Sequence, residues 1–479
     1  MICRQFILRI LLKLKSEFIE VIQDLRFKKI AKPSEVDLNI IGAKLLLRDQ
    51  LLEGGISIEE GKIIKIGKEP SLPKADKIHD VKGLLTIPGL IDTHVHLRDL
   101  QLSYKEDFYT GTCAAAAGGF TTILDMPNNV PLTYSAANLR LRRDEAMTKV
   151  IVNVGFHAGL VDDKSEIQKM SSMGIYSFKL YMNNYYSQID VENDVTLAEN
   201  FSTCKIINVP ITVHAEDRST IEQRIKDFKG KPIKLKDYCY IHDLDVEETA
   251  VKRIIGIAEK TGATIHICHI SNSSTIDEIE EARDKGISVT GEITPHHMIL
   301  SKDDLEKLGG WALMDPPLRQ ISETENLWNG LLNKEFLTVA SDHAPHSLLE
   351  KSSQDIREIT PGIPGLETTL PILLTKVSRG RLSLSAIPKI LAERPAKIFG
   401  LKGKGELSEG ADADITILDL KKEFVIDPDK FHSKARYSPF TGENCIGCVS
   451  KVFLAGKMIF ENGEILTPPG SGQVLGVKT

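Results

Sequence analysis

The 479-residue sequence lacks several features that would point to particular classes of protein. No uninterrupted apolar stretch approaches the roughly 18 residues that a membrane span needs. Lys and Arg total 60 against 66 Asp and Glu, so the net charge of −6 offers no excess of positive charge for nucleic acid. Internal repeats and low-complexity tracts are also absent. We therefore expect a soluble globular protein whose partner is a small molecule or another protein and not nucleic acid.

Cysteine is scarce, and its distribution argues against disulfides. The seven cysteines are scattered along the chain, at positions 3, 113, 204, 239, 268, 445 and 448. An odd number of dispersed cysteines is a poor disulfide framework and favours a reducing compartment, so we expect a cytoplasmic location. Cys445 and Cys448 form a C-x-x-C without a second pair nearby, and we interpret them as packing residues of a strand.

The N-terminal segment, residues 1–36, differs from the rest of the chain. It is rich in Lys and Arg, and apolar residues recur in it at helical spacing, which predicts an amphipathic helix. Arg9 interrupts the apolar stretch and no small-residue cleavage site follows, so a signal peptide is a poor interpretation. A docked helix or an appended tail is the first expectation, and a membrane-surface role is the alternative.

From residue 89 to residue 400, short apolar segments alternate with helical patterns. The predicted strands are 90–92, 121–125, 150–155, 177–181, 211–214, 264–268, 288–292 and 336–340. The predicted helices are 104–118, 135–148, 165–173, 195–208, 247–261, 274–285, 322–333 and 364–379. Eight such units predict an α/β protein with a (β/α)8 TIM-type barrel. The alternative, a doubly wound open sheet, would need a Gly-rich phosphate loop after the first strand, and histidines stand there instead.

Both flanks of the barrel have a β pattern. Residues 37–68 and 405–467 alternate between apolar and polar side chains and are interrupted by turn pairs such as Gly54-Gly55 and Asn462-Gly463. We predict that the two chain ends assemble into one small β-sandwich. The predicted domains are an extension (1–36), a first half-sandwich (37–88), the barrel (89–400), and a second half-sandwich with a C-terminal tail (401–479).

Polar residues stand at the ends of the predicted barrel strands, where barrel enzymes place their chemistry. The candidate metal ligands are His94, His96, His214, His269 and Asp342. His94 and His96 are two residues apart, so both side chains point to the same side of an extended strand. Imidazoles and a carboxylate at one barrel mouth indicate a site for a divalent cation, with zinc favoured.

Lys179 lies inside an apolar strand, where burial of a charged amine is costly. Three outcomes are open from the residues alone: the side chain extends to solvent, it pairs with an acid, or it is neutralised chemically. A neutral amine could react with carbon dioxide, and the resulting carbamate would be an anionic bridge between two metal ions.

Several motifs resemble those of the dihydroorotases, within the cyclic amidohydrolase group. They are Pro88-Gly-Leu-Ile-Asp-Thr-His-Val-His-Leu-Arg98, Gly118-Gly-Phe-Thr-Thr122, Met126-Pro-Asn128, Phe178-Lys-Leu-Tyr181, Val213-His-Ala-Glu216, His266-Ile-Cys-His-Ile-Ser271, Ala340-Ser-Asp-His-Ala-Pro-His346 and Pro364-Gly-Leu-Glu-Thr368. The resemblance extends over about residues 37–465 and implies two Zn²⁺ per chain. It implies that His94, His96 and Asp342 hold one metal, that His214 and His269 hold the other, and that carboxylated Lys179 bridges them.

The resemblance also implies a reaction, the reversible cyclisation of N-carbamoyl-aspartate to dihydroorotate in pyrimidine synthesis. Asp342 would act as the general base and then as the general acid. Arg98, two residues beyond His96, would hold the substrate carboxylate, which hydantoins and dihydropyrimidines lack. By resemblance, Asn128 and His346 would complete this contact. For Arg98, the alternative is a surface ion pair with Asp99 or Asp107.

Two features depart from the family pattern and one has no counterpart in it. Asp315 stands where bacterial-type relatives usually have Asn, at a position expected to contact substrate, and it would have to accept an N–H bond there. The segment Ile241–Glu248 lacks the Arg-Pro often found before its helix, and residues 1–36 have no family counterpart. Other residues have weaker roles: Tyr181 reaches the site or packs in the core, 183–190 form a lid or an ordinary loop, and His297 either supports the site residues or is structural. For His157 and His242 the spacing indicates no role.

Other functions are weighed against this interpretation. An allantoinase or a hydantoinase (dihydropyrimidinase) would share the fold and the metal site. A catalytically inactive barrel that serves as an assembly partner is the alternative of another class. A homodimer, and association with an aspartate carbamoyltransferase, are conceivable partnerships that the residues themselves do not indicate.

Overall fold

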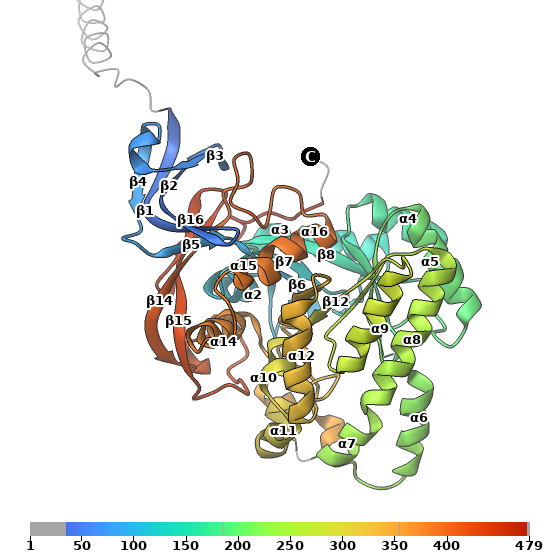
Figure 1. Ribbon diagram of the computed structural model, residues 1–479. Coiled ribbons are helices and arrows are strands. Elements are labelled where there is room, and N and C mark those ends of the chain that lie inside the picture. The colour runs from blue at the N-terminus through green and yellow to red at the C-terminus, as the bar shows by residue number, and fades with distance from the viewer. Residues whose placement is uncertain (1–34, 184, 354, 477–479) are drawn as a thin grey trace, which may run out of the picture.

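The computed structural model describes residues 35–183, 185–353 and 355–476, which form a barrel with a separate sheet beside it (Figure 1). The predicted N-terminal helix lies outside the described residues. Among the residues that are described, no helix combines the length and the apolar character needed to cross a membrane.

Eight parallel strands, hydrogen-bonded in sequence order, form the barrel. They are β6 (Leu90–Val95), β7 (Phe120–Asp125), β8 (Asn153–Gly159), β9 (Ser177–Tyr181), β10 (Ile211–His214), β11 (Ile265–Ile267), β12 (Val289–Ile293) and β13 (Leu337–Val339). His343, just after β13, bridges Val95 in parallel, and its carbonyl accepts from the amide of His96 at 2.8 Å. This contact joins the last strand to the first, and the predicted (β/α)8 barrel is confirmed.

Helices follow the strands and cover the outer face of the barrel (Figure 1). The helices that follow the eight strands in turn are α2 (Phe108–Ala117), α3 (Ala136–Lys149), α4 (Lys164–Ser172), α5 (Asp194–Ile206), α8 (Leu244–Thr261), α9 (Ser273–Asp284), α12 (Ile321–Asn333) and α14 (Leu366–Ser378). In α8 the buried residues recur every three or four positions, so one face packs on the barrel. The Asp243 side chain caps its first turn, and Gly262, in the left-handed conformation at φ +69°, ends it.

Further helices extend the loops at the barrel mouth and elsewhere. They are α6 (Arg218–Asp227), α7 (Leu235–Ile241), α10 (Pro295–Ile299), α11 (Lys302–Leu308), α13 (Leu348–Lys351), α15 (Ala386–Pro388) and α16 (Arg394–Phe399), with single turns η1 (Glu69–Ser71), η2 (Leu100–Leu102), η3 (Gly309–Ala312), η4 (Ile356–Glu358), η5 (Lys389–Glu393) and η6 (Pro428–Lys430). Helices α6 and α7 were not predicted. Together they form an insertion between β10 and α8, called the α6–α7 excursion below, which reaches the barrel mouth.

Both chain ends build the second sheet. Its strands are β1 (Val36–Leu47), β2 (Gln50–Glu59), β3 (Lys62–Gly67), β4 (Ala75–Asp80), β5 (Leu85–Pro88), β14 (Ile415–Val425), β15 (Asn444–Leu454), β16 (Lys457–Glu461) and β17 (Glu464–Ile465). The two halves meet where β5 pairs antiparallel with β14, with Leu85 opposite Leu418. In Figure 1 the blue N-terminal strands and the red β14 and β15 lie side by side.

A bulge in β1 lets this strand pair with two different strands, β4 and β5. Its first half pairs with β4 and its second half with β5, and Gly42 lies between them at φ +65°. A Cβ atom there would lie 2.3 Å from a carboxylate oxygen of Asp80, so the position favours glycine. Cys445 and Cys448 are free cysteines on β15, which agrees with their interpretation as strand residues.

Hydrogen bonds attach the sheet and the C-terminal tail to the barrel. The Thr416 hydroxyl donates to the carbonyl of Gly119 at 2.7 Å, and the Asn153 amide donates to Asp414 at 2.9 Å. The tail then runs along β8, where the Val154 amide donates to the carbonyl of Gln473 at 2.8 Å. The barrel is thereby held by residues from the far end of the chain.

Candidate metal centre and active site

Six of the residues singled out in the sequence come together at the carboxyl end of the barrel. They are His94 and His96 at the end of β6, Lys179 in β9, His214 at the end of β10, His269 after β11 and Asp342 after β13. The histidines and Asp342 line one pocket of about 540 Å³, which also contains Arg98, Asn128, Asp315 and His346. Parallel strands bring these side chains to one rim because all of them end at the same edge.

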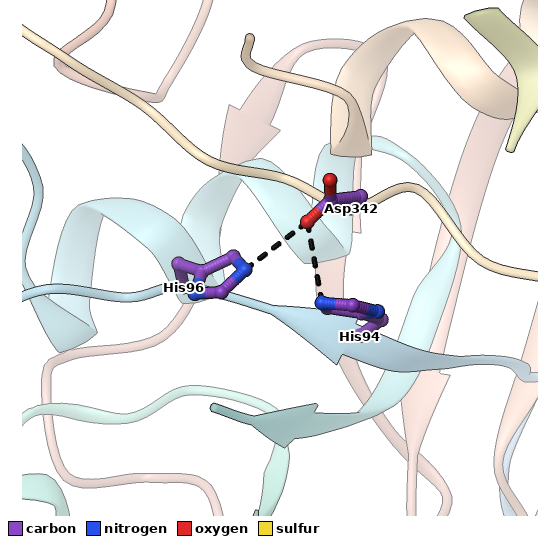
Figure 2. A group of neighbouring side chains, drawn as sticks. All are labelled: His94, His96 and Asp342. Atoms are coloured by element: carbon purple, nitrogen blue, oxygen red, sulfur yellow. Dashed lines mark hydrogen bonds and ion pairs between the residues drawn. The ribbon is translucent and has the colours of Figure 1, made fainter. Parts of the chain in front are cut away.

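Figure 2 shows the first cluster, in which His94 and His96 point at the same carboxylate. The Oδ1 atom of Asp342 lies 3.0 Å from Nε2 of His96 and 3.3 Å from Nε2 of His94. The two rings are 5.2 Å apart, as expected for side chains on one side of an extended strand. Three ligand atoms of types that zinc prefers therefore converge on a small volume.

A second pair lies next to the first. Nδ1 of His214 is 2.9 Å from Nε2 of His269. The His269 ring lies 5.4 Å from the His94 ring, so the two groups adjoin one another at the barrel axis.

The outer nitrogens of three of these rings are held by oxygen acceptors. Nδ1 of His94 donates to Glu292 at 2.5 Å, Nδ1 of His96 donates to Asn128 at 2.5 Å, and Nε2 of His214 donates to Glu216 at 2.7 Å. Metal-binding histidines are oriented in this way, because the held N–H fixes the tautomer and leaves the other nitrogen unprotonated.

The atoms that face one another across the centre are then acceptors. Unprotonated Nε2 atoms of His94 and His96 oppose the Asp342 carboxylate at 3.3 and 3.0 Å. Acceptors at such distances repel each other unless a positive charge lies between them. These residues therefore fit a divalent cation, and the cluster has the composition of a zinc site.

The protonation states agree with metal binding, which requires neutral imidazoles and an ionised carboxylate. Burial lowers the pKa of His96 to about 3, and burial together with the neighbouring His214 lowers the pKa of His269 well below its ordinary value.

Lys179 is almost completely buried, at 1% exposure, so it does not reach solvent. Its Nζ donates to the sulfur of Cys268 at 2.9 Å and lies 5.0 Å from the ring centre of Tyr181. No carboxylate forms an ion pair with it among the described residues. Of the outcomes considered from the sequence, extension to solvent is wrong, and pairing with an acid is not seen among the described residues.

The backbone is strained at three site residues. Arg98, His269 and Asp342 have φ values of +53°, +35° and +46°, in the region that L residues rarely adopt. Such conformations cost of the order of 1–3 kcal/mol each and persist where the surrounding structure fixes them. Here they turn three side chains into the pocket.

Arg98 is 5% exposed and lies beside His346, with Nη2 of Arg98 3.2 Å from Nε2 of His346. The surface ion pair considered as an alternative is wrong. Asp99 pairs with Lys149, and Asp107 pairs with Lys434. Within the described part of the chain Arg98 has no carboxylate partner, and its Nε donates to the carbonyl of Pro345 at 3.3 Å.

Asn128 and Asp315 also line the pocket, and each has contacts that the sequence did not indicate. The Asn128 side-chain oxygen is used by His96, so only its amide NH₂ is available to a ligand. Asp315 accepts from the hydroxyl of Tyr238 at 3.2 Å, and its Oδ1 lies 3.3 Å from Nδ1 of His242. Burial and the nearby Glu216 raise the pKa of Asp315 to about 6.

The remaining candidates are placed as follows. Tyr181 lines the pocket, as do Asn183, Tyr185 and Tyr186 of the segment predicted as a lid or a loop. His297 is structural, as expected, because its ring nitrogens contact Thr294 at 2.8 Å and the carbonyl of Pro316 at 3.0 Å.

Sequence reasoning missed Glu292, Glu216 and His242. Glu216 and Glu292 each stand near a strand end, and Glu216 is two residues beyond His214, a spacing that could have suggested it. The role of His242 depends on the α6–α7 excursion, which carries it to the pocket from a part of the chain with no strand-end signal.

Comparisons with known proteins agree with this geometry. The model of the amidohydrolase family matches residues 85–459. A dihydroorotase of Methanothermobacter thermautotrophicus is 37% identical over 424 residues, covering 88% of this chain and 94% of that protein. A dihydroorotase of Methanosphaera stadtmanae is 37% identical over 415 residues, covering 86% and 94%.

Among solved structures, an L-hydantoinase (dihydropyrimidinase) from Arthrobacter aurescens superposes with a TM-score of 0.88 at 31% identity. The match covers 92% of this chain and 99% of that chain. A family match over most of the chain, relatives above 30% identity and the barrel-mouth cluster lead to one conclusion: this chain is a hydrolase and belongs to the amidohydrolase family.

Proposed function

We propose that this cyclic-amide hydrolase is a dihydroorotase, which interconverts N-carbamoyl-L-aspartate and dihydroorotate in pyrimidine biosynthesis. The relatives with 37% identity bear that name. The substrate carries a carboxylate next to a ring amide, so its site needs a fixed cation close to the hydrolytic centre. Arg98 and His346 supply this arrangement.

The observation that carries the proposal is the buried guanidinium of Arg98, which contacts the Pro345 carbonyl and the His346 ring but has no carboxylate partner among the described residues. A buried charge without a partner destabilises the protein, so its retention calls for a ligand that compensates it. A planar carboxylate accepts two parallel N–H bonds from an Arg, which gives both affinity and orientation. Burial and the neighbouring Arg98 lower the pKa of His346 well below its ordinary value, so His346 contributes a neutral ring.

The cofactor proposed is a pair of Zn²⁺ ions, one held by His94, His96 and Asp342 and the other by His214 and His269, with Lys179 as an N6-carboxylysine bridge. The buried amine of Lys179, free of an acidic partner in the described residues, supports its modification by carbon dioxide. Zinc, when bound, polarises a carbonyl and lowers the pKa of water towards about 7.

Asp342 is proposed as the group that moves the proton. In ring opening it takes a proton from the attacking water and transfers it to the departing ring nitrogen, and in ring closure it removes a proton from the carbamoyl nitrogen. The carboxylate must be ionised to act as the base. The strained φ of +46° aims the carboxylate at the centre.

Asn128 and Asp315 are proposed to bind the rest of the substrate. The amide NH₂ of Asn128 donates to the substrate carboxylate beside Arg98. Asp315 can only accept, so it suits a ring N–H or the carbamoyl NH₂.

A hydantoinase or dihydropyrimidinase is the second candidate, because the similar solved structures include such enzymes. The buried Arg98 disfavours it, since the rings of hydantoin and dihydrouracil carry no carboxylate. The complete set of ligands at the barrel mouth disfavours an inactive assembly partner.

The test is a parallel assay of the purified protein with dihydroorotate, allantoin, hydantoin and dihydrouracil, with zinc measured on the same sample. We expect turnover of dihydroorotate with about two zinc ions per chain. Turnover of a neutral ring without turnover of dihydroorotate would overturn the proposal in favour of the second candidate.

A further inference from the structure

His242 lies between two carboxylates at the edge of the pocket. Its Nδ1 is 2.9 Å from Oε1 of Glu216 and 3.3 Å from Oδ1 of Asp315. The two family departures in the sequence, Asp315 and the segment 241–248, therefore meet in one contact. His242 itself touches none of the proposed metal ligands, whereas Glu216 also accepts from Nε2 of His214 at 2.7 Å.

The arrangement brings the negative charges of Glu216 and Asp315 close together in the protein interior. Glu216 is fully buried and His242 is 2% exposed. Carboxylate oxygens of Glu216 and Asp315 lie within 4.8 Å of each other. Two neighbouring buried carboxylates repel one another, and a positive charge between them removes that cost. In agreement, Glu216 and Asp315 raise the pKa of His242 although burial opposes this.

The surroundings fix His242 in this position. Arg319 donates to the backbone carbonyl of His242, and the Arg319 Nε also donates to the Ser271 hydroxyl at 3.0 Å. On its other side the ring of Tyr238 lies 4.4 Å from the His242 ring, and the same tyrosine donates to Asp315. The imidazole therefore cannot leave the two carboxylates without disturbing several contacts.

We propose that His242 is a positioning residue for Asp315: it compensates the Asp315 and Glu216 carboxylates and holds Asp315 as the acceptor for an N–H group of the substrate. The inference rests on the proposed function for the identity of the substrate, a cyclic ureide with ring N–H groups. Without the imidazole, Asp315 would face an anionic substrate with an uncompensated charge, or turn away from the pocket.

A double-mutant cycle tests this proposal with His242→Gln, Asp315→Asn and the double variant. If His242 acts through Asp315, His242→Gln raises the KM for dihydroorotate about 10- to 100-fold, the range for one hydrogen bond to a charged group. It changes kcat less and leaves the zinc content unchanged. The double variant is then no worse than Asp315→Asn alone. Additive effects of the two substitutions on KM would overturn the proposal.

The control is His432→Gln. His432 contacts a carboxylate too, with Nδ1 3.2 Å from Glu367, but it does not line the pocket. We expect an unchanged KM. An equal rise in KM for this variant would show that loss of any histidine–carboxylate contact suffices, which would also overturn the proposal.

Urea unfolding of the wild type and of the three variants of the cycle gives a readout that needs no substrate. His242→Gln should lower the unfolding midpoint, and adding Asp315→Asn should recover part of the loss, because one carboxylate is then neutral. If dihydroorotate is not turned over by the wild type, the proposed function fails while this recovery still supports the charge compensation. Absence of any recovery would overturn the compensation itself.

Discussion

Glu292 holds the ring of His94 from inside the barrel, with its Oε1 2.5 Å from the His94 Nδ1. Its second oxygen accepts from the Thr93 hydroxyl at 3.2 Å and lies 3.2 Å from Nε2 of His266. The carboxylate is 1% exposed, so three neighbours define its position and no solvent competes for it. The orientation of the first proposed ligand is therefore set by strand β12, across the barrel.

Glu292→Gln should weaken metal binding. The neutral amide still accepts a hydrogen bond, but it makes the His94 ring less basic, and such changes cost about 10- to 100-fold in metal affinity. Zinc affinity measured against a competing chelator checks this. The matched control is Glu247→Gln, a buried glutamate that binds the Ser271 and Thr275 hydroxyls, and its zinc affinity should not change. Equal affinities in both variants and the wild type would contradict the prediction.

Arg98→Met should abolish the turnover of dihydroorotate and leave zinc bound. Two charge-assisted hydrogen bonds to a carboxylate are worth about 1.5–3 kcal/mol each, so kcat/KM should fall at least about 100-fold. Turnover and zinc content of one preparation measure the two effects separately. Arg253→Met on the exposed side of α8 removes an ion pair with Asp194 and serves as the control. Unchanged turnover by Arg98→Met would remove the argument for a carboxylate contact.

Activity should depend on carbon dioxide through Lys179. After dialysis with chelator under strict exclusion of carbon dioxide, we expect low activity that bicarbonate and zinc restore together, because the buried amine must be converted to a carbamate before it can bridge two metals. Zinc alone is the comparison. Full recovery with zinc alone, still without carbon dioxide, would count against the carbamate.

His157, inside the barrel, should make the fold sensitive to acid. Burial lowers its pKa to about 3, although its contact with the Thr93 carbonyl opposes this, so the folded ring stays neutral where the unfolded ring, with a pKa near 6.5, takes up a proton. Stability is thus lost as the pH falls from 6.5 towards 3, by up to about 1.4 kcal/mol per pH unit.

The measurement is urea unfolding of the wild type and His157→Gln between pH 4.5 and 7.5. The variant should lose less free energy of unfolding over this range than the wild type, whatever its stability at neutral pH. The other histidines are common to both proteins and cancel in the difference. Parallel pH dependence in the two proteins would show that His157 does not control the acid response.

The sequence predicted most of what depends on periodicity. Strands β9 and β10 were predicted with the bounds that the structure has, and the position of His214 at the end of β10 followed from the rule that parallel strands finish at one rim. Strand β8 was predicted to start at Val150, but it starts at Asn153. Val150 is instead the C-cap of α3, and its carbonyl accepts from the Gly472 amide of the tail. An apolar run alone does not distinguish the start of a strand from the end of the preceding helix.

The contacts around the ligands could not be predicted, because they join distant segments. Glu292 and His94 are 198 residues apart, and His242 reaches Asp315 only through the α6–α7 excursion. A single sequence shows that such residues are polar, but the register of a closed barrel decides which of them meet.

The sheet built from both chain ends has a consequence for synthesis. Strand β5 emerges from the ribosome more than 300 residues before β14, its partner. The early strands thus wait, with an unpaired edge, until the whole barrel has been translated, and pairings of such long sequence separation form slowly. Maturation of the nascent polypeptide therefore ends with closure of this sheet, and during that wait its first strands are the segments that a chaperone would need to protect.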